Sequence, residues 1–580
     1  MFRQPETMFR KKIQTRTVNP DHLATLIQSG ADPLLAQLYA ARAVQNPDEL
    51  DDHLQLLIPY QQLTNCERAA QRLAQAIEQQ EKILIIADYD ADGATACSVA
   101  MKGLGAMGAV VDFFVPNRFE HGYGLTPELA DIAAQKGANL IVTVDNGISS
   151  REGVARAYEL GMDVLVTDHH HAGDHVPDCI IVNPNQKGCT FPSKNLAGVG
   201  VIFYVLMALR AELRARHYFS GSLKEPNLGD LLDLVAVGTV ADVVPLDHNN
   251  RILVSQGLKR IRAGKTGYGI LALFQAARYD AKKAQPMDIG FKIAPRINAA
   301  GRLDDMSVGI ACLLAQDWEM AQSIAAELNE LNHTRQEIEQ GMLQQILGEF
   351  PDRLPENQTT LTAYRPDFHQ GVVGIVASRL KDKFYRPTFV FAPDDDGNLR
   401  GSGRSIQGVH LRDVVDTIAK QCPDLIYKFG GHAMAAGLTM RGDGLAQFQA
   451  AFEDVVAKLV DKDILSQIFL TDGSLNAADL TLERVQFLAT QVWGQGFPQP
   501  TFCDEFVITR QQSMGADGKH RKAWLKKNGQ NQQEVEAVFW RCEHELPEEI
   551  RVVYRPVVNE WGNRVDLQLY VEHWEEVLPF

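Results

Sequence analysis

Five aspartates and two adjacent histidines follow three short apolar runs in the first half of this chain. They are Asp88, Asp90 and Asp92 after the run 82–87, Asp145 after 139–144, and Asp168, His169 and His170 after 162–167. So many carboxylates in one dry cleft would repel one another unless cations occupied it, because buried charge without a partner is costly. These residue types therefore predict bound metal.

The available donor atoms indicate which metal the site would prefer. Carboxylate oxygens and imidazole nitrogens without thiolates suit Mg²⁺ or Mn²⁺ better than a structural zinc ion. A further carboxylate, Asp242, ends another apolar segment. So many donors fit a pair of ions about 3.5–4 Å apart, the arrangement by which phosphatases, nucleases and polymerases activate water. A calcium loop of the EF-hand type is excluded because its twelfth position, Val99, is not glutamate.

The three apolar runs have the composition of buried parallel strands. They are rich in β-branched residues, bounded by glycine and separated by helical stretches, which is typical of an α/β sheet. Ligands of such sheets collect beyond the carboxyl ends of the strands. We therefore expect the acidic residues to meet at that edge. Because neighbours on an extended segment point opposite ways, we expect only one of His169 and His170 to face a given ion, and favour His169.

The order of these motifs resembles that of the DHH phosphoesterase superfamily. Residues 88–93 read DYDADG, 144–147 VDNG, 168–170 DHH and 238–246 GTVADVVPL, and 430–432 resemble the GGH motif of the accessory domain. Five motifs in this order, in a chain of this length, are most similar to the members that degrade single-stranded DNA from its 5′ end. The resemblance covers roughly residues 60 to 580.

The resemblance implies a role for each residue of the cluster. The metal ligands would be Asp90, Asp92, Asp145, His169 and Asp242, with Asp145 bridging two Mg²⁺ or Mn²⁺ ions. Asp88 and Asp168 would orient these ligands, and His170 would face the scissile phosphate. Hydrolysis then needs no Ser or Cys nucleophile.

Two glycine-rich turns in the second half are candidates for binding phosphate. One spans residues 400–405 and contains Ser402 and Arg404, and the other contains His432. Glycine lets the backbone approach an anion closely, while Arg and Ser donate hydrogen bonds. A plain loop is the alternative for either turn alone, and the order of Arg404 and His432 favours the phosphate interpretation.

Four further residues are candidates for contacts with nucleic acid. Arg118, Arg296 and Arg302 lie in stretches that resemble the family's nucleic-acid-binding segments, against the alternative of ordinary surface arginines. Trp524 interrupts the basic run 519–527 and could stack on a base, whereas basic residues alone often form a solvated face. The other basic group lies in residues 251–265, after the fourth motif.

The predicted fold class is α/β with a C-terminal barrel, in five parts. Residues 1–60 form an N-terminal helical segment, 61–310 the parallel-sheet DHH domain and 311–350 a connecting helix. Residues 351–460 form a smaller α/β domain of DHHA1 type, and 461–580, with short strands rich in Val, Phe, Trp and Tyr, form an OB-fold-like β-barrel. A helix of about 30 residues reaches roughly 45 Å and would set two domains apart on either side of a groove.

Composition agrees with a large intracellular protein. The 580 residues are 45% hydrophobic and contain eight scattered cysteines without a CxxC pair, which predicts reduced thiols in the cytoplasm. No apolar run is long enough for a membrane span, so we expect no membrane partner. The net charge of −16 means that DNA would follow a local basic path.

Three functions compete. The first is an exonuclease acting on single-stranded DNA, with a single-stranded-DNA-binding protein and a helicase as the family's partners and a monomeric state. The second is a phosphodiesterase for very short oligonucleotides or cyclic dinucleotides, which would have no use for a C-terminal barrel. The third is a scaffold that binds nucleic acid without cleaving it, which would be expected to have lost metal ligands. Every ligand is present here, which favours the exonuclease.

Overall fold

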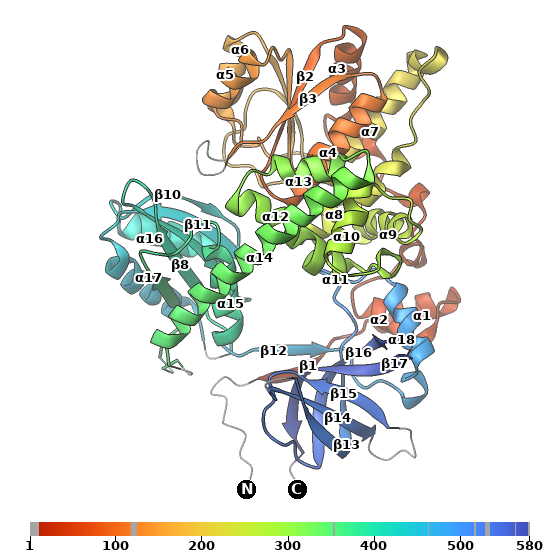
Figure 1. The fold of residues 1–580 in the computed structure, drawn as a ribbon, viewed down its shortest axis with the longest axis vertical. Coiled ribbons are helices and arrows are strands. Elements are labelled where there is room, and N and C mark those ends of the chain that lie inside the picture. Colours follow the sequence, from red (N-terminus) through yellow and green to blue (C-terminus); the bar gives the residue numbers. More distant parts are fainter. Residues whose placement is uncertain are drawn as a thin grey trace.

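The structure is a computed structural model that describes residues 11–117, 124–351, 354–355, 357–461, 463–515, 518–527, 534–562 and 564–577. Figure 1 shows three bodies, which we name the first α/β unit (residues 66–314), the second α/β unit (residues 361–459) and the barrel (residues 502–576). The first unit lies at the top, the second unit at the left and the barrel at the bottom of the view.

The first unit is built on a parallel sheet with the strand order β3-β2-β4-β5-β6. Its strands are β2 (Lys82–Ala87), β3 (Val110–Phe114), β4 (Leu140–Val144), β5 (Asp163–Thr167) and β6 (Ile180–Val182). The three predicted strands are thus confirmed. Alternate side chains of each strand enter different cores, as Ile83 and Ile85 contact one helical layer and Leu84 and Ile86 the other.

Helices cover both faces of this sheet. One face carries α3 (Cys66–Glu78), α4 (Ala91–Ala106) and α7 (Gly198–Ala215), and the other carries α5 (Pro127–Gln135) and α6 (Arg151–Glu159). The rest of the unit is helical, with α8 (Leu232–Ala241), α9 (His248–Arg262), α10 (Tyr268–Ala276), α11 (Pro286–Asp288), α12 (Ala294–Leu303) and α13 (Ser307–Leu314). Asp242 therefore follows a helix, unlike the other acidic residues, which follow strands.

The long helix α14 (Trp318–Glu349) joins the two α/β units, as predicted. The second unit has a mixed sheet in the order β10-β11-β9-β8-β7. Its elements are β7 (Leu361–Tyr364), α15 (Val373–Phe384), β8 (Thr388–Pro393), β9 (Leu399–Arg404), α16 (Leu411–Gln421), β10 (Ile426–Gly431), β11 (Ala435–Met440) and α17 (Leu445–Leu459).

The C-terminal strands close into a five-stranded barrel in the order β13-β14-β15-β17-β16, an OB-like arrangement. They are β13 (Phe502–Met514), β14 (His520–Lys527), β15 (Val535–Phe539), β16 (Glu549–Trp561) and β17 (Arg564–Glu576), preceded by α18 (Leu482–Thr490). Strands β13, β15, β16 and β17 contain the short runs rich in Val, Phe, Trp and Tyr from which the barrel is predicted. The fifth, β14, is the run that the sequence presents only as a basic patch.

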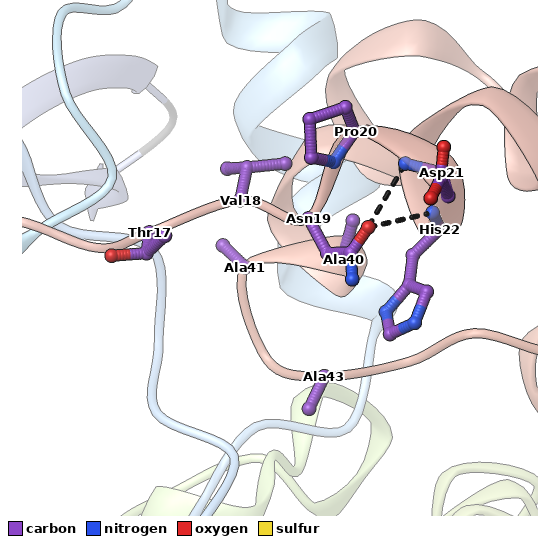
Figure 2. A pocket seen from close by; sticks show the side chains of 9 residues that line it. All are labelled: Thr17, Val18, Asn19, Pro20, Asp21, His22, Ala40, Ala41 and Ala43. Carbon is purple, nitrogen blue, oxygen red and sulfur yellow. Dashed lines mark hydrogen bonds between the residues drawn. The ribbon is translucent and has the colours of Figure 1, made fainter.

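The described part of the N-terminal segment begins with a strand and continues as helices. Residues Lys12–Thr15 form β1, which pairs in parallel with β12 (Ile468–Thr471), the strand that leads into the barrel. Helices α1 (Pro20–Gln28) and α2 (Pro33–Ala40) follow. Asn19 caps α1 by accepting hydrogen bonds from the backbone of Asp21 and His22, beside a surface pocket between the two helices (Figure 2). No helix among the described residues has the length and apolarity to cross a membrane.

Candidate metal and phosphodiester site

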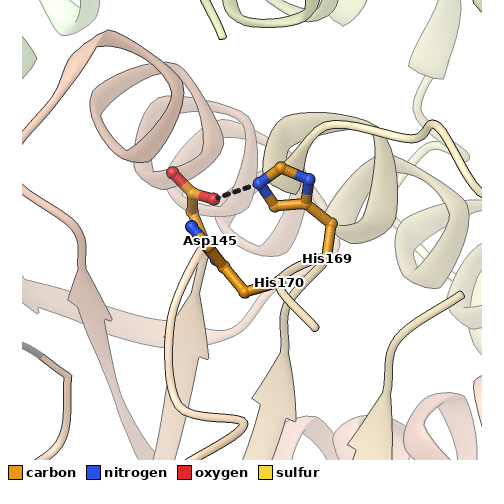
Figure 3. Close-up of side chains that lie close together, drawn as sticks. All are labelled: Asp145, His169 and His170. Carbon is orange, nitrogen blue, oxygen red and sulfur yellow. Dashed lines mark ion pairs between the residues drawn. The ribbon is translucent and has the colours of Figure 1, made fainter. Parts of the chain in front are cut away.

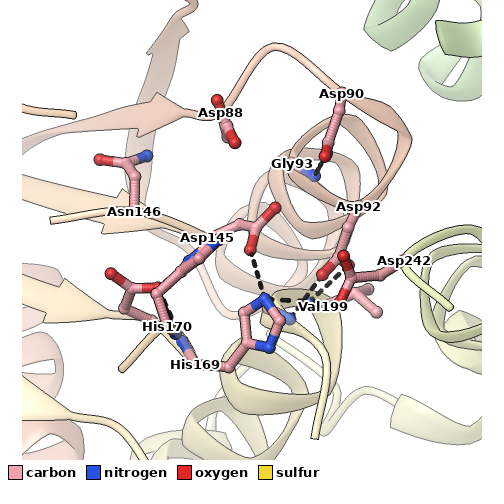
Figure 4. Close-up of polar contacts among 12 residues, drawn as sticks. Asp88, Asp90, Asp92, Gly93, Asp145, Asn146, His169, His170, Val199 and Asp242 are labelled. Carbon is pink, nitrogen blue, oxygen red and sulfur yellow. Dashed lines mark hydrogen bonds and ion pairs between the residues drawn. The ribbon is translucent and has the colours of Figure 1, made fainter. Parts of the chain in front are cut away.

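The predicted acidic residues meet at the carboxyl edge of the parallel sheet. Strand order reverses between the neighbouring strands β2 and β4, because β3 lies on the other side of β2. This switch point is where α/β sheets bind ligands. Asp88 and Asp90 follow β2, Asp145 follows β4, and His169 comes from beyond β5 (Figure 4).

The turn after β2 positions two carboxylates through the start of α4. Asp90 caps this helix, and its Oδ1 accepts a hydrogen bond from Gly93 N at 3.0 Å. Gly93 has to be glycine, because a Cβ there would lie 2.4 Å from the carbonyl oxygen of Asp88. Asp92, in the first turn of the helix, is 1% exposed. The turn thus presents both carboxylates to the same cleft.

The N-terminus of α7 holds the Asp92 carboxylate. Gly198 N donates to Asp92 Oδ2 at 2.6 Å and Val199 N donates to Oδ1 at 3.0 Å. The positive end of a helix stabilises a carboxylate in this position. Asp92 is therefore fixed in orientation while its remaining lone pairs stay available.

Asp145 occupies a strained backbone position, with φ of 63°. The next residue, Asn146, anchors the turn by donating to the carbonyl oxygens of Ile86 and Val144. Left-handed backbone at a residue other than glycine is typical of functional sites. Gly198 packs against the side chain, since a Cβ there would lie 2.5 Å from Asp145 Cβ.

The two histidine rings lie on the same side, and the expectation that they point opposite ways is wrong. Their ring centroids are 4.6 Å apart. The strand ends at Thr167, and the Asp168 carboxylate accepts from the backbone N–H of both histidines, at 2.7 and 3.1 Å, so the segment turns instead of remaining extended. His169 Nε2 lies 3.2 Å from Asp145 Oδ1 (Figure 3) and 3.4 Å from Asp242 Oδ2.

Asp168 and His170 form a hydrogen-bonded pair. His170 Nδ1 lies 2.8 Å from Asp168 Oδ1, and Asp168 Oδ2 accepts from Ile148 N at 2.9 Å. Burial alone would lower the pKa of His170, but the hydrogen bond with Asp168 raises it to about 9. Asp168 is fully buried, and the same hydrogen bond outweighs the effect of burial and lowers its pKa. The pair therefore keeps a proton on His170 and a charge on Asp168.

The remaining carboxylates repel one another. Burial and the Asp242 carboxylate raise the pKa of Asp92 to about 7, while burial and Asp90 raise that of Asp242 to about 8. Burial and Asp92 raise the pKa of Asp145 well above its usual value. His169 is the opposite case, because burial and the neighbouring His170 lower its pKa and favour the neutral ring.

This cluster fits divalent cations. The buried His169 Nε2 has no hydrogen-bond partner among the described residues and faces carboxylate oxygens, as a metal-ligating nitrogen would. The potential ligand atoms of the cluster fall into overlapping groups. Within each group, all of these atoms lie within 4.8 Å of one another. The groups are Asp88, Asp90 and Asp145; Asp92, His169 and Asp242; and Asp145, His169 and His170. The third group shares Asp145 with the first and His169 with the second, and two groups linked in this way suit a pair of ions.

The second unit brings one predicted residue directly to this site. His432 follows β10, and its ring stacks near His170, with centroids 6.4 Å apart, and near His171 at 5.6 Å. Ser402 and Arg404 lie on β9, so the expected glycine-rich turn at 400–405 is in fact a strand. Gly401 of this strand has to be glycine, because a Cβ there would lie 2.3 Å from the Phe391 ring that packs against it.

Arg404 is suited to bind an anion. Its guanidinium donates to Ser402 Oγ at 3.1 Å and to the carbonyl oxygen of Gly403. No carboxylate lies within ion-pair distance of it among the residues that the structure describes, and burial lowers its pKa. The nearby Gly374, at the start of α15, would place a Cβ 3.0 Å from the guanidinium.

The other candidates for DNA contacts are dispersed. Arg302 donates to the carbonyl oxygen of Gly371 at 3.0 Å, across the seam between the α/β units. Arg296 bonds to Asn329 on α14, and Trp524 stacks under the Arg510 guanidinium, 3.9 Å from its ring centroid, on the barrel. Arg118 lies outside the described residues.

The basic group after the fourth motif is structural. Arg251 is 7% exposed and packs 4.2 Å from the Phe497 ring centroid. Lys259 pairs with Asp52, and Arg260 pairs with Asp230. These side chains stabilise the fold and leave little free charge for DNA.

Three asparagines that the sequence analysis missed hold the site. Asn183 and Asn185, after β6, donate to the carbonyl oxygens of His170 and His169 at 2.9 and 2.6 Å. Asn298 on α12 accepts from Ala91 N at 2.8 Å, between Asp90 and Asp92. Polar residues directly after a fourth apolar run could have revealed the first two. Nothing near Asn298 in the sequence points to its role.

Three family models match the chain. Residues 82–239 match the N-terminal domain of the DHH family, 357–458 the DHHA1 domain and 471–573 the RecJ OB domain.

Curated proteins are similar over nearly the whole chain. The single-stranded-DNA-specific exonuclease RecJ of Salmonella typhimurium is 45% identical over 97% of this chain and 99% of its own length, and that of Escherichia coli is 44% identical over the same shares. Among solved structures, RecJ of Thermus thermophilus in complex with Mn²⁺ gives a TM-score of 0.82 at 29% identity, covering 98% of this chain and 80% of that one. The same protein in complex with Mg²⁺ gives 0.76 at 28% identity, covering 98% and 79%.

Proposed function

The chain belongs to the RecJ family of single-stranded-DNA-specific exonucleases, and on that premise we propose that it hydrolyses single-stranded DNA from the 5′ end to 5′-mononucleotides. Two divalent cations, Mg²⁺ or Mn²⁺, serve as cofactors, and DNA repair and recombination are the processes concerned. The observation that carries this proposal is the buried cluster of Asp88, Asp90, Asp92, Asp145, His169 and Asp242 at the switch point of the sheet.

We propose that the two ions are shared between the ligand groups. Asp90, Asp92, Asp145, His169 and Asp242 are the proposed ligands, and Asp88 lies close enough to Asp90 and Asp145 to join them. When bound, such ions activate a water molecule and offset the negative charge that develops at phosphorus. Asp92 stays oriented by α7, and Asp145 by the turn at Asn146.

His170 would act on the scissile phosphate itself. Hydrolysis breaks the bond between phosphorus and O3′ of the terminal nucleotide, and an oxygen from water takes its place. Because Asp168 holds Nδ1, His170 presents Nε2 and can donate its proton toward the departing O3′. Asp168 keeps its charge throughout and orients the ring.

The second unit would hold the 5′ end. Arg404 and Ser402 form a donor pair without a carboxylate partner among the described residues, and His432 lies beside His170. A terminal phosphate bound there would place the next phosphodiester at the acidic cluster. Arg302 at the seam, Arg118, Arg296 and Trp524 are proposed to contact the strand farther along.

Three further proposals follow from this activity. The protein would act as a monomer in the cytoplasm, where chromosomal DNA is processed. A helicase would supply single strands, and a single-stranded-DNA-binding protein would deliver them. The domain boundaries given from the sequence remain proposals.

The test uses a long single strand labelled at either end, its duplex and a dinucleotide, each incubated with Mg²⁺ or Mn²⁺. Wild type is compared with Asp145→Ala and with Asp163→Ala, which removes an exposed carboxylate at the opposite end of β5. We expect mononucleotides from the 5′ end of the single strand alone, with Asp163→Ala active and Asp145→Ala inactive.

Other outcomes would assign other functions. Cleavage confined to the dinucleotide would identify a small-substrate phosphodiesterase. Binding of the strand without cleavage by any variant would identify a scaffold. Release from the 3′ end would contradict the proposed polarity alone.

A further inference from the structure

Part of the second sheet has an uncovered face. Helices α16 and α17 pack on one side, over Leu399, Leu438 and Met440. On the other side α15 packs over β7 and β8, and its first turn reaches β9 at Ser402 and Arg404. The outward residues of β10 and β11 beyond it, Lys428, Gly430 and Gly437, are exposed.

The strand register arranges this face in rows. Arg404 pairs with Ala435 in the first row, next to His432. Ser402, Gly437 and Gly430 form the second row, and Arg400, Thr439 and Lys428 form the third. Rows are two residues apart along each strand, or about 7 Å. Only Ser402 and the two glycines of the second row therefore lie between Arg404 and the cations of the third row, Arg400 and Lys428.

The third row carries available positive charge. The Arg400 side chain is 44% exposed, and its only ion-pair contact among the described residues is a long one, with Nε 3.9 Å from Asp394 Oδ2. Asp394 is also bound within its own turn, since its Oδ1 accepts from Asp396 N and Asn398 N and its Oδ2 accepts from Asn398 Nδ2 at 3.4 Å. Lys428 forms no ion pair with any residue that the structure describes. Both cations flank the Thr439 hydroxyl, because side chains directly opposite on neighbouring strands lie about 5 Å apart.

An exposed tyrosine precedes Lys428 in the sequence. The register shifts between Ile426 and Lys428, and Tyr427, at this irregularity, is 60% exposed. Basic residues combined with exposed aromatic rings are typical of sites for single-stranded nucleic acid.

We propose that Arg400, Thr439 and Lys428 form a second phosphate-binding subsite, which continues the surface of Arg404 away from the acidic cluster. This proposal rests on the proposed function, and its ligand is a nucleotide phosphate. Because the proposed function places the 5′ end of the strand at Arg404, the phosphate beyond it belongs to the mononucleotide that leaves after hydrolysis. Gly430 and Gly437 leave room for this nucleotide to pass, since a Cβ at Gly430 would meet nothing within 4 Å.

The test compares wild type with Arg400→Ala/Lys428→Ala and with Lys420→Ala/Lys458→Ala. The control removes two exposed lysines from α16 and α17, on the covered side of the sheet, so both variants lose the same charge. Thermal unfolding checks that each variant is folded. Binding of a 3′-labelled oligonucleotide is measured in EDTA over a range of salt concentrations, and inhibition of cleavage by 5′-dAMP is measured with Mn²⁺.

Each outcome has a defined meaning. If the subsite holds the strand instead, the dissociation constant of the oligonucleotide rises about tenfold in Arg400→Ala/Lys428→Ala and the slope of log K against log salt falls by about one, while inhibition by 5′-dAMP is unchanged; this result would overturn the assignment of the subsite to the product. If the subsite holds the product, the inhibition constant of 5′-dAMP rises about tenfold and the salt slope is unchanged. Values equal to those of the control in both assays would overturn the subsite. Absence of cleavage by wild type would contradict the proposed function instead, and the binding assay would still test the subsite.

Discussion

His169 and His170 are neighbours with different chemistry. His169 faces the carboxylates of Asp145 and Asp242, and its lowered pKa favours the neutral ring that binds a metal ion. His170 is hydrogen-bonded to Asp168 and keeps its proton. One residue type thus supplies a ligand and a proton donor, because the partner of each ring differs.

Asp168→Asn should separate these two roles. The amide cannot hold a charged His170, so we expect the rate of the chemical step to fall about 10²- to 10⁴-fold. The ligand carboxylates are untouched, so Mn²⁺ affinity should fall by less than about tenfold. A tenfold loss of affinity is the smallest effect typical of removing a group that orients metal ligands. Single-turnover kinetics and isothermal titration calorimetry measure the two quantities. Equal losses in both would show that Asp168 only supports the metal site.

Metal-free protein should become less stable as pH rises from about 4 to about 8. Burial and neighbouring carboxylates raise the pKa of Asp92 to about 7 and that of Asp242 to about 8, so the folded state binds more protons than the unfolded state across this interval. Stability then falls with pH, by an amount on the order of a few kcal/mol. Thermal unfolding in EDTA tests this, and saturating Mn²⁺ should remove most of the dependence. A melting temperature that rises over the interval would contradict the repulsion described here.

Helix α7 acts on the site through its first turn. Its backbone N–H groups hold Asp92, and Gly198 lies against Asp145, so one element positions carboxylates from two strands. We expect Gly198→Ala to displace Asp145 and to weaken Mn²⁺ binding about 10- to 100-fold, the effect of disturbing groups that orient ligands. Gly105→Ala on α4 is the control, because a Cβ there would meet nothing within 4 Å. Calorimetric titration with Mn²⁺ gives both affinities, and an unchanged value for Gly198→Ala would show that the contact relaxes.

Some elements could be predicted from the sequence, and others depend on distant partners. Strands β2, β4 and β5 are continuous apolar runs that end in charged residues, so their place and their role follow from the pattern. Strand β14 presents lysines outward and has a buried arginine, Arg521, so its sequence looks like a solvated basic run. Strand β1 has no internal signal, because β12, its only strand partner among the described residues, begins far along the chain at Ile468.

The residues of the site divide in the same way, into those that the sequence reveals and those that only the fold brings together. The acidic ligands are visible in the sequence because several carboxylates that follow buried apolar runs would repel one another without a cation. The asparagines that hold them are not, since each acts through a backbone group that only the fold brings close. The paired orientation of the histidines was missed for the same reason, because Asp168 turns the chain through hydrogen bonds to the backbone.

The N-terminal segment ties the barrel to the rest of the molecule. Strand β1 pairs with β12, and Arg42, after α2, forms two hydrogen bonds to the Asp472 carboxylate. Asp472 in turn accepts from the backbone of Thr501, directly before the first barrel strand. The position of the barrel relative to the catalytic cluster therefore depends on residues at the start of the chain.

Arg42→Ala should loosen the barrel without changing the chemical step. Both side chains of the pair with Asp472 are 1% exposed. Removing one partner of a buried pair costs up to about 3–5 kcal/mol, and Asp472 would keep only the longer contact with Arg16, at 3.5 Å, as an ion pair among the described residues. We expect proteolysis between the second unit and the barrel to accelerate, and cleavage of a long strand to weaken at least tenfold in kcat/KM. Cleavage of a trinucleotide, which is too short to reach the barrel, should stay within about twofold of wild type.

Lys12→Ala, which breaks the exposed pair with Asp463, is the control. It should change neither the rate of proteolysis nor cleavage of the long strand, since exposed pairs contribute about 0–1 kcal/mol. Equal losses on both substrates would mean that Arg42 supports the catalytic unit as a whole rather than the reach of the enzyme along its strand.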